Sequence, residues 1–324
     1  MNILYILGNG FDRAQNMKTS YSDFYEYLDN DKEVGSVLFQ QLKSEIKKDI
    51  EEGKQLWSNM EWGFGSFTKN IKSAYELEDL HYEVTKRLQS YLKVQNQTFT
   101  PTQDQIDKFS NDFINPGNRI HETDKNAYGK FIRPYGSRVF IDVISLNYTD
   151  TLEKLLAIKH SSKRKVFNES VQLMNICHVH GRLNSTIIFG VDNVDQINNT
   201  AFRALHDVKN FMVKKDFNLA MKNNSHSVCE NYIKNANLII LFGVSLGETD
   251  KHWWSFIGNE MKNRKSLGII ECVHRPNDVP PDRMYLMDTV EQKSKQELLM
   301  KLNLSPDDVE GRMFFIINSK MFNV

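Results

Sequence analysis

The chain has 324 residues, which is about the length of two average domains or of one large α/β domain with an insertion. Hydrophobic residues make up 40% and charged residues 25%, a composition that excludes a disordered, collagen-like or coiled-coil protein. Lys and Arg together number 41, as do Asp and Glu. The chain therefore carries no net charge that would attract it to nucleic acid or to an anionic membrane.

The cysteines and the apolar segments indicate in which cellular compartment the protein works. The three cysteines are an odd number without a C-x-x-C spacing, which fits a reducing environment. No basic leader precedes the first apolar run, and the longest apolar stretch, 238–246, is shorter than the roughly 20 residues that a membrane-spanning helix needs. We therefore expect a cytoplasmic protein without a membrane segment.

Short apolar runs along the chain predict buried β-strands. They lie at 3–7, 139–146, 173–179, 186–191, 238–244, 267–273 and 313–317. All except 186–191 are nearly continuous, which is typical of strands covered on both faces and therefore of a mainly parallel sheet. Predicted helices alternate with the later strands, so we expect an α/β fold with a doubly wound, Rossmann-like sheet.

The segment between the first two strands has helical spacing instead. Ser20 and Asp23 resemble a capping box at the start of a helix, and apolar residues recur every three or four positions as far as Leu92. We expect a single α/β nucleotide-binding domain over residues 1–324, with a helical insertion over residues 19–135.

The first strand ends in a glycine-rich turn. Gly8 and Gly10 would let the backbone approach a phosphate or a ribose, with amide groups directed at the anion. Asn9 belongs to the same turn, and Asp12 could hold a ribose hydroxyl or cap the next helix. A G-x-G turn that merely ends a strand accounts for the same residues equally well.

Three later strand ends also carry polar residues. Asn147 follows the second strand, where a carboxamide can orient a water or a ligand amide. His180, followed by Gly181, could act as a general base. Gly243 and Ser245 follow the apolar strand at 238–244 and suit a phosphate.

Each of these strand ends is also compatible with a plainer role. His178 and His180 lie two apart and would point to the same face, where either could be structural. H-x-H is also a metal-binding pattern, for which Asp192, Asp250 or His252 could supply a third ligand. Asp250 is equally compatible with a favourable charge at a helix N-terminus.

These strand-end motifs, in this order, resemble the AbiH family of bacteriophage abortive-infection proteins. The opening motif is fairly specific, and the resemblance extends from residue 3 to about residue 255. The segments that carry it are 6–12 (ILGNGFD), 19–24 (TSYSDF), Trp57 with Glu61, 146–150 (LNYTD), 178–181 (HVHG) and 242–247 (FGVSLG) with Asp250.

The same order is similar, more distantly, to the sirtuin-like NAD-binding fold. That resemblance implies that Gly8, Gly10 and Ser245 contact the cofactor, while Asn147 and His180 lie beside the nicotinamide ribose. Asn9, Asp12, Asp23, Gly243 and Asp250 complete the expected cofactor-binding set. The zinc-binding cysteine pairs of sirtuins are absent, which argues against protein deacylation, and Asp150 follows Asn147 by three positions instead of two.

These resemblances imply an antiphage protein that depletes NAD on infection. We expect an NAD glycohydrolase in which Asn147 and His180 are catalytic, NAD is the substrate and no metal takes part. A phage-derived trigger would activate it, and a homo-oligomer is compatible with the sequence. Two alternatives stay open: a nucleotide-binding sensor or switch without turnover, and a metal-dependent nuclease or phosphoesterase built on His178, His180, Asp192 and Asp250.

Overall fold

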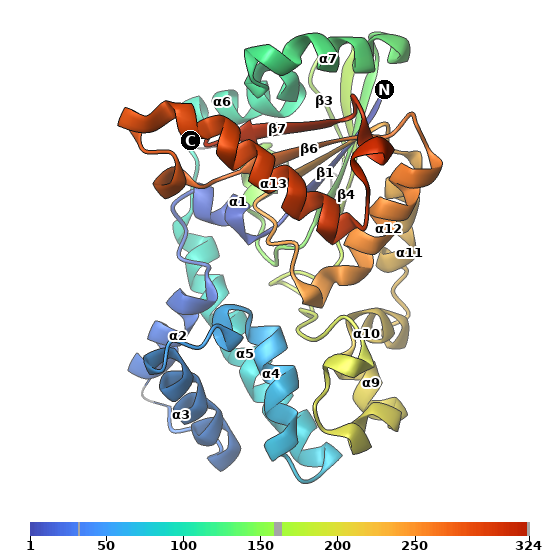
Figure 1. Cartoon of the computed structure of the whole chain (residues 1–324). Coiled ribbons are helices and arrows are strands. Elements are labelled where there is room, and N and C mark those ends of the chain that lie inside the picture. The colour runs from blue at the N-terminus through green and yellow to red at the C-terminus, as the bar shows by residue number, and fades with distance from the viewer. Residues whose placement is uncertain (32, 159–163, 323–324) are drawn as a thin grey trace.

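A computed structural model describes residues 1–31, 33–158 and 164–322. Its centre is a seven-stranded sheet, with helices on both faces and a helical lobe below the carboxyl ends of the strands (Figure 1). The strands are β1 (Asn2–Leu7), β2 (Val139–Ser145), β3 (Lys165–Val166), β4 (Val171–His178), β5 (Leu238–Phe242), β6 (Gly268–Val273) and β7 (Met313–Ile317).

The strand order is β3-β4-β2-β1-β5-β6-β7, and only the edge pair β3–β4 is antiparallel. Numbered along the chain, the six parallel strands follow the 3-2-1-4-5-6 order of doubly wound sheets. The order reverses between β1 and β5. In such sheets ligands bind outside the carboxyl ends of the strands at this point, so the topology directs attention to the turns after β1 and β5.

The predicted parallel sheet is confirmed, because six of the seven predicted strands form it. The seventh prediction, a strand at 186–191, is wrong. This segment makes only isolated bridges, from Ile187 to Gly181 and from Val191 to Val213. Its apolar side chains pack against helices in place of a neighbouring strand.

The insertion after β1 is helical, as predicted, and it divides into two parts. Helices α2 to α5 build the lower lobe in Figure 1, whereas α6 and α7 return to cover the sheet. The helices that lie between β1 and β2 are α1 (Asn9–Ala14), α2 (Tyr21–Asn30), α3 (Val37–Glu51), α4 (Met60–Phe67), α5 (Ala74–Thr98), α6 (Gln103–Ile114) and α7 (Glu122–Ile132).

The remaining helices follow the later strands. They are α8 (Thr151–Leu155), α9 (His206–Met212), α10 (Lys214–Ala220), α11 (Ser225–Asn235), α12 (Lys251–Asn263) and α13 (Met287–Leu302). No helix in the described ranges is both long and apolar enough to cross a membrane.

Three hydrophobic cores hold these layers together. One lies between the sheet and α11, α12 and α13, and a second lies on the opposite face under α6, α7 and α8. The third core belongs to the lower lobe. It joins α2–α5 to residues of the distant segment 183–213, including Leu183, Phe189 and Met212. The lobe is therefore built from two separate stretches of chain.

Candidate active site

The four polar strand ends meet at one edge of the sheet. The registers bring this about, because Leu7 at the end of β1 pairs with Ser145 of β2 and with Phe242 of β5, and Ser145 pairs in turn with His178 of β4. The turns that follow these residues therefore lie side by side. The sequence-based expectation that they form one site is consistent with this geometry.

The turns after β1 and β5 pack directly on each other. The amide of Gly8 donates to the carbonyl of Phe242 at 3.0 Å, and the amide of Gly10 donates to the carbonyl of Gly243 at 2.9 Å. A Cβ on Gly10 would lie 2.5 Å from the Cα of Gly243, whose own φ is +65°. These glycines are thus required for the close approach of two backbones, and the amide of Gly10 is already hydrogen-bonded.

Asn147 and Asp12 are buried and stabilise this junction. Asn147 Nδ2 donates to the carbonyl of Gly8 at 3.0 Å, which ties the end of β2 to the end of β1. The hydroxyl of Thr149 donates to Asp12 Oδ2 at 2.7 Å. Burial raises the pKa of Asp12 to about 6, although its hydrogen bonds to Thr149 and Thr151 oppose that rise.

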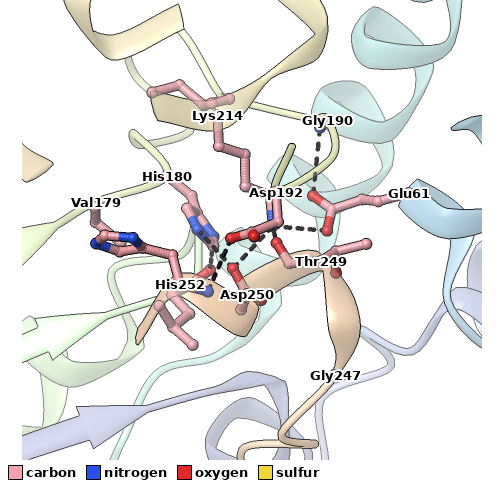
Figure 2. A network of polar contacts seen from close by, with 12 residues as sticks. Glu61, Val179, His180, Gly190, Asp192, Lys214, Gly247, Thr249, Asp250 and His252 are labelled. Carbon is pink, nitrogen blue, oxygen red and sulfur yellow. Dashed lines mark hydrogen bonds and ion pairs between the residues drawn. The ribbon is translucent and has the colours of Figure 1, made fainter. Parts of the chain in front are cut away.

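A buried ion network lies beside the junction, as Figure 2 shows. His180 Nε2 lies 3.2 Å from Asp250 Oδ1, and the ammonium group of Lys214 lies 2.9 Å from the same oxygen. Lys214 also reaches Glu61 Oε2 at 2.8 Å and donates to the carbonyl of Thr249 at 3.0 Å. Two acids and two bases from four separate segments therefore share one enclosed space.

The charges in this network are unequally stabilised. Burial alone would raise the pKa of Asp250, but Lys214 and then His180 outweigh it and hold that pKa well below its usual range. Burial raises the pKa of Glu61, and Lys214 only partly opposes this. Asp250 is thus the carboxylate of the network that stays ionised most readily.

Both ring nitrogens of His180 face hydrogen-bond acceptors. Nδ1 lies 3.2 Å from the carbonyl of Leu146, and Nε2 faces Asp250. The carbonyl of Leu146 can only accept, so Nδ1 carries a proton and Nε2 is the nitrogen that faces Asp250. In this arrangement His180 can therefore exchange a proton only at Nε2, beside Asp250.

His178 belongs to a different cluster, behind the strand end. Its Nε2 lies 2.9 Å from Glu153 Oε1, and its Nδ1 lies 2.9 Å from the carbonyl of Asn147. Arg182 donates to the same oxygen of Glu153 at 2.6 Å. These contacts identify His178 as a structural residue that fixes α8 against β4.

A pocket of about 180 Å³ opens next to the ion network. It is lined by His180, Lys214 and Asp250 from the network and also by Val179, Asp192, Asn193, Lys215, Asn218, His226, His252 and Trp253. Most of the lining residues are polar, and they include side chains of both charges, so the pocket suits a ligand with hydroxyl or phosphate groups.

The other predicted cofactor-binding residues lie at varying distances from this network. Ser245 is exposed on the turn after β5. Asn9 is exposed and exchanges hydrogen bonds with Thr19, and Asp23 forms the predicted capping box with Ser20 at the start of α2. That Ser245, Asn9 and Asp23 contact a ligand stays a prediction. The hydrogen bonds within the protein already explain the positions of Asn9 and Asp23.

Sequence reasoning missed Lys214 as a site residue and placed Glu61 only among the family-resemblance residues. Lys214 begins α10, and a single lysine in a helical pattern carries no signal of burial. Glu61 lies in the first turn of α4, where an acid is ordinarily read as favourable to the helix dipole. Only the packing of α4 against the distant segment that leads into α10 brings the two together.

The proposed metal-binding set of His178, His180, Asp192 and Asp250 does not assemble as expected. His178 faces Glu153, whereas His180 faces Asp250. Asp192 instead accepts a hydrogen bond from the backbone amide of His252 at 3.0 Å. Within the described ranges, the group of His, Cys, Asp or Glu side chains close enough to share an ion is His226, Glu230 and His252.

A comparison with protein families shows to which family the chain belongs. A family model described as "Bacteriophage abortive infection AbiH" matches residues 4–270, which is most of the chain. The chain belongs to the AbiH family. It is thus an antiphage abortive-infection protein of that family, and the resemblance drawn from its motifs is confirmed. No curated protein matches the chain.

The AbiH match places the candidate site within the family region. Residues 4–270 include all four strand ends, the lobe residue Glu61 and the start of α12. The strands β6 and β7 lie partly or wholly beyond the match and contribute no side chain to the ion network.

Proposed function

We propose that this AbiH protein hydrolyses NAD at the bond between nicotinamide and ribose. The observation that carries the proposal is the placement of the His180–Asp250 pair. It is largely buried, it lines a pocket, and it lies at the carboxyl edge of a doubly wound sheet where dinucleotides bind in other proteins of this architecture.

The chemistry of the reaction suits an ionised carboxylate beside a histidine. The bond between C1′ and the nicotinamide nitrogen breaks, nicotinamide leaves with the bonding electrons, and positive charge develops on the ribose. Asp250, kept ionised by Lys214, would stabilise that charge. Water adds to C1′ and releases one proton, for which Nε2 of a neutral His180 ring would be the acceptor, beside Asp250.

The size of the pocket limits how the substrate can bind. A volume of about 180 Å³ is smaller than the roughly 300–1,000 Å³ of typical ligand pockets. We therefore assign the nicotinamide riboside half to the pocket and the adenosine half to the surface above the turns after β1 and β5. Asn147, which braces Gly8, is assigned a positioning role.

NAD measured during phage infection tests the proposal. Cells that express the wild type should lose NAD on infection, whereas His180→Ala should retain it, since general-base help is worth roughly 10²–10⁴-fold in rate. His206→Ala, at an exposed histidine, is the matched control and should behave as the wild type. His180→Gln, with a melting curve for each variant, separates loss of chemistry from loss of folding. Full NAD cleavage by purified, folded His180→Ala would overturn the assignment.

One observation favours a second function, a nucleotide-binding switch without turnover. Both nitrogens of His180 are engaged, and Asp250 is shared by His180 and Lys214, as expected of a resting site that only binds. The same experiments separate the two functions. Binding of NAD by the purified protein with no nicotinamide released, even with phage components present, would select the switch.

A further inference from the structure

A second cluster of side chains lies at the wall of the pocket, apart from the ion network. His226 and Glu230 are four residues apart on α11 and therefore share a face of that helix. His252 reaches them from the first turn of α12. One ligand atom from each of the three residues lies within 4.8 Å of the other two.

The distances between the ligand atoms of this cluster are close to those between the ligand atoms around a bound metal ion. Glu230 Oε1 lies 3.5 Å from His226 Nδ1 and 3.1 Å from His252 Nε2. Zinc binds imidazole nitrogen and carboxylate oxygen at about 2.0–2.2 Å, and tetrahedral geometry then places neighbouring ligand atoms about 3.3 Å apart. Two sides of the triangle thus have the required length without movement of the backbone.

The surroundings hold the two rings in place and leave the cluster accessible. The ring centroids of His226 and His252 lie 4.5 Å and 5.0 Å from that of Trp253, and the backbone amide of His252 donates to Asp192. Glu230 and His252 keep about a quarter of their side-chain surface exposed, so an ion can enter from solvent. Orientation by neighbouring residues is what preformed metal sites require.

We propose that His226, Glu230 and His252 bind one divalent cation of the zinc class, with a further coordination position open to the pocket. Two imidazoles and one carboxylate with an open position are the ligand set of catalytic zinc sites. The open position follows from the lining, because both histidines face the same pocket as Asp250. An anionic oxygen of a ligand or a water would complete the coordination.

This site has a direct structural relationship to the ion network. His252 follows Asp250 by two residues, so an ion that joins α11 to α12 would also fix the start of α12. The inference does not depend on NAD hydrolysis. A cation bound here would exist whether the neighbouring pocket cleaves a nucleotide or only binds it.

Metal content tests the proposal. The full chain, purified without a polyhistidine tag and stripped with a chelator, is reloaded with Zn²⁺, dialysed and analysed by mass spectrometry. We expect one Zn²⁺ per chain in the wild type and at least about 10-fold weaker binding in Glu230→Gln and His252→Ala. His206→Ala, which removes an exposed histidine, should bind as the wild type does.

Co²⁺ provides an independent readout. Bound at this site, it should give the intense visible absorption of tetrahedral coordination, and Glu230→Gln, the most conservative variant, should lose that spectrum while its melting temperature in the absence of metal is kept. Wild type that retains no more Zn²⁺ than the Glu230→Gln variant would overturn the proposal. NAD cleavage plays no part in either measurement, so this proposal and the proposed function fail separately.

Discussion

Lys214 is the residue whose removal should disturb the buried network most. Its ammonium group contacts Glu61 at 2.8 Å and Asp250 at 2.9 Å, and its side chain is only 8% exposed. Lys214→Met keeps a similar unbranched chain but removes the charge. Asp250 would retain His180 as a partner, whereas Glu61 would keep, among the described residues, only the amide of Gly190, which lies 3.5 Å from its Oε1.

The magnitude follows from the burial of the partners. Removal of one member of a buried ion pair costs about 3–5 kcal/mol, because the other charge stays desolvated and unpaired. Glu61 can limit this cost by taking up a proton, which its raised pKa favours. We therefore expect a loss of about 3–5 kcal/mol near neutral pH and a smaller loss in mild acid.

Urea unfolding, analysed by linear extrapolation, measures the effect. Lys108→Met is the matched control. Lys108 forms a 2.6 Å ion pair with Asp104, but the lysine side chain is 63% exposed, so its loss should cost no more than about 1 kcal/mol. Adding Glu61→Gln to Lys214→Met should restore about 1 kcal/mol or more, because the unpaired carboxylate is removed. A Lys214→Met protein within about 1 kcal/mol of the wild type, with an unchanged dependence on urea, would refute this reasoning.

Two further substitutions test the junction of the strand ends. Gly10→Ala places a Cβ 2.5 Å from the Cα of Gly243 and should destabilise the protein by about 1–3 kcal/mol in urea unfolding, whereas Gly129→Ala, in α7 with no neighbour within 4 Å, should be neutral or slightly stabilising. Burial raises the pKa of Asp12 from 3.8 to about 6, so the stability that its protonated form contributes is fully present below about pH 4 and is lost as the pH rises through 6. Asp12→Asn should therefore gain up to about 3 kcal/mol relative to the wild type between about pH 4 and pH 7 in urea titrations, and a pH-independent difference would contradict the assignment.

The sheet could be predicted because its strands are buried on both faces. A run such as 238–242 is apolar at every position, which is typical of a central strand of a parallel sheet. The strand predicted at 186–191 is wrong for a physical reason. Every residue from 187 to 191 is buried, as in a central strand, but Ile187, Phe189 and Val191 are covered by the helical lobe and not by neighbouring strands.

The candidate site could be predicted only as far as the strand ends. A parallel sheet gathers the residues after its strands at one edge, so Asn147, His180 and Asp250 could be grouped from the sequence alone. Glu61 and Lys214 come from α4 and α10, and their contact depends on how the two stretches of the lower lobe pack together. His226 and Glu230 lie one helical turn apart, a spacing visible in the sequence, but nothing there shows that His252 completes the triad.

The shared core of the lower lobe bears on how this protein can be dissected. Helices α2–α5 are consecutive in the sequence, yet they bury their apolar faces against residues that follow β4. Excision of the block would leave Leu183, Phe189 and Met212 in water and Lys214 without Glu61. The lobe therefore cannot be removed or exchanged as an independent unit. Its part in defence must be studied by point substitution, and its two stretches of sequence are expected to change together when the protein diverges.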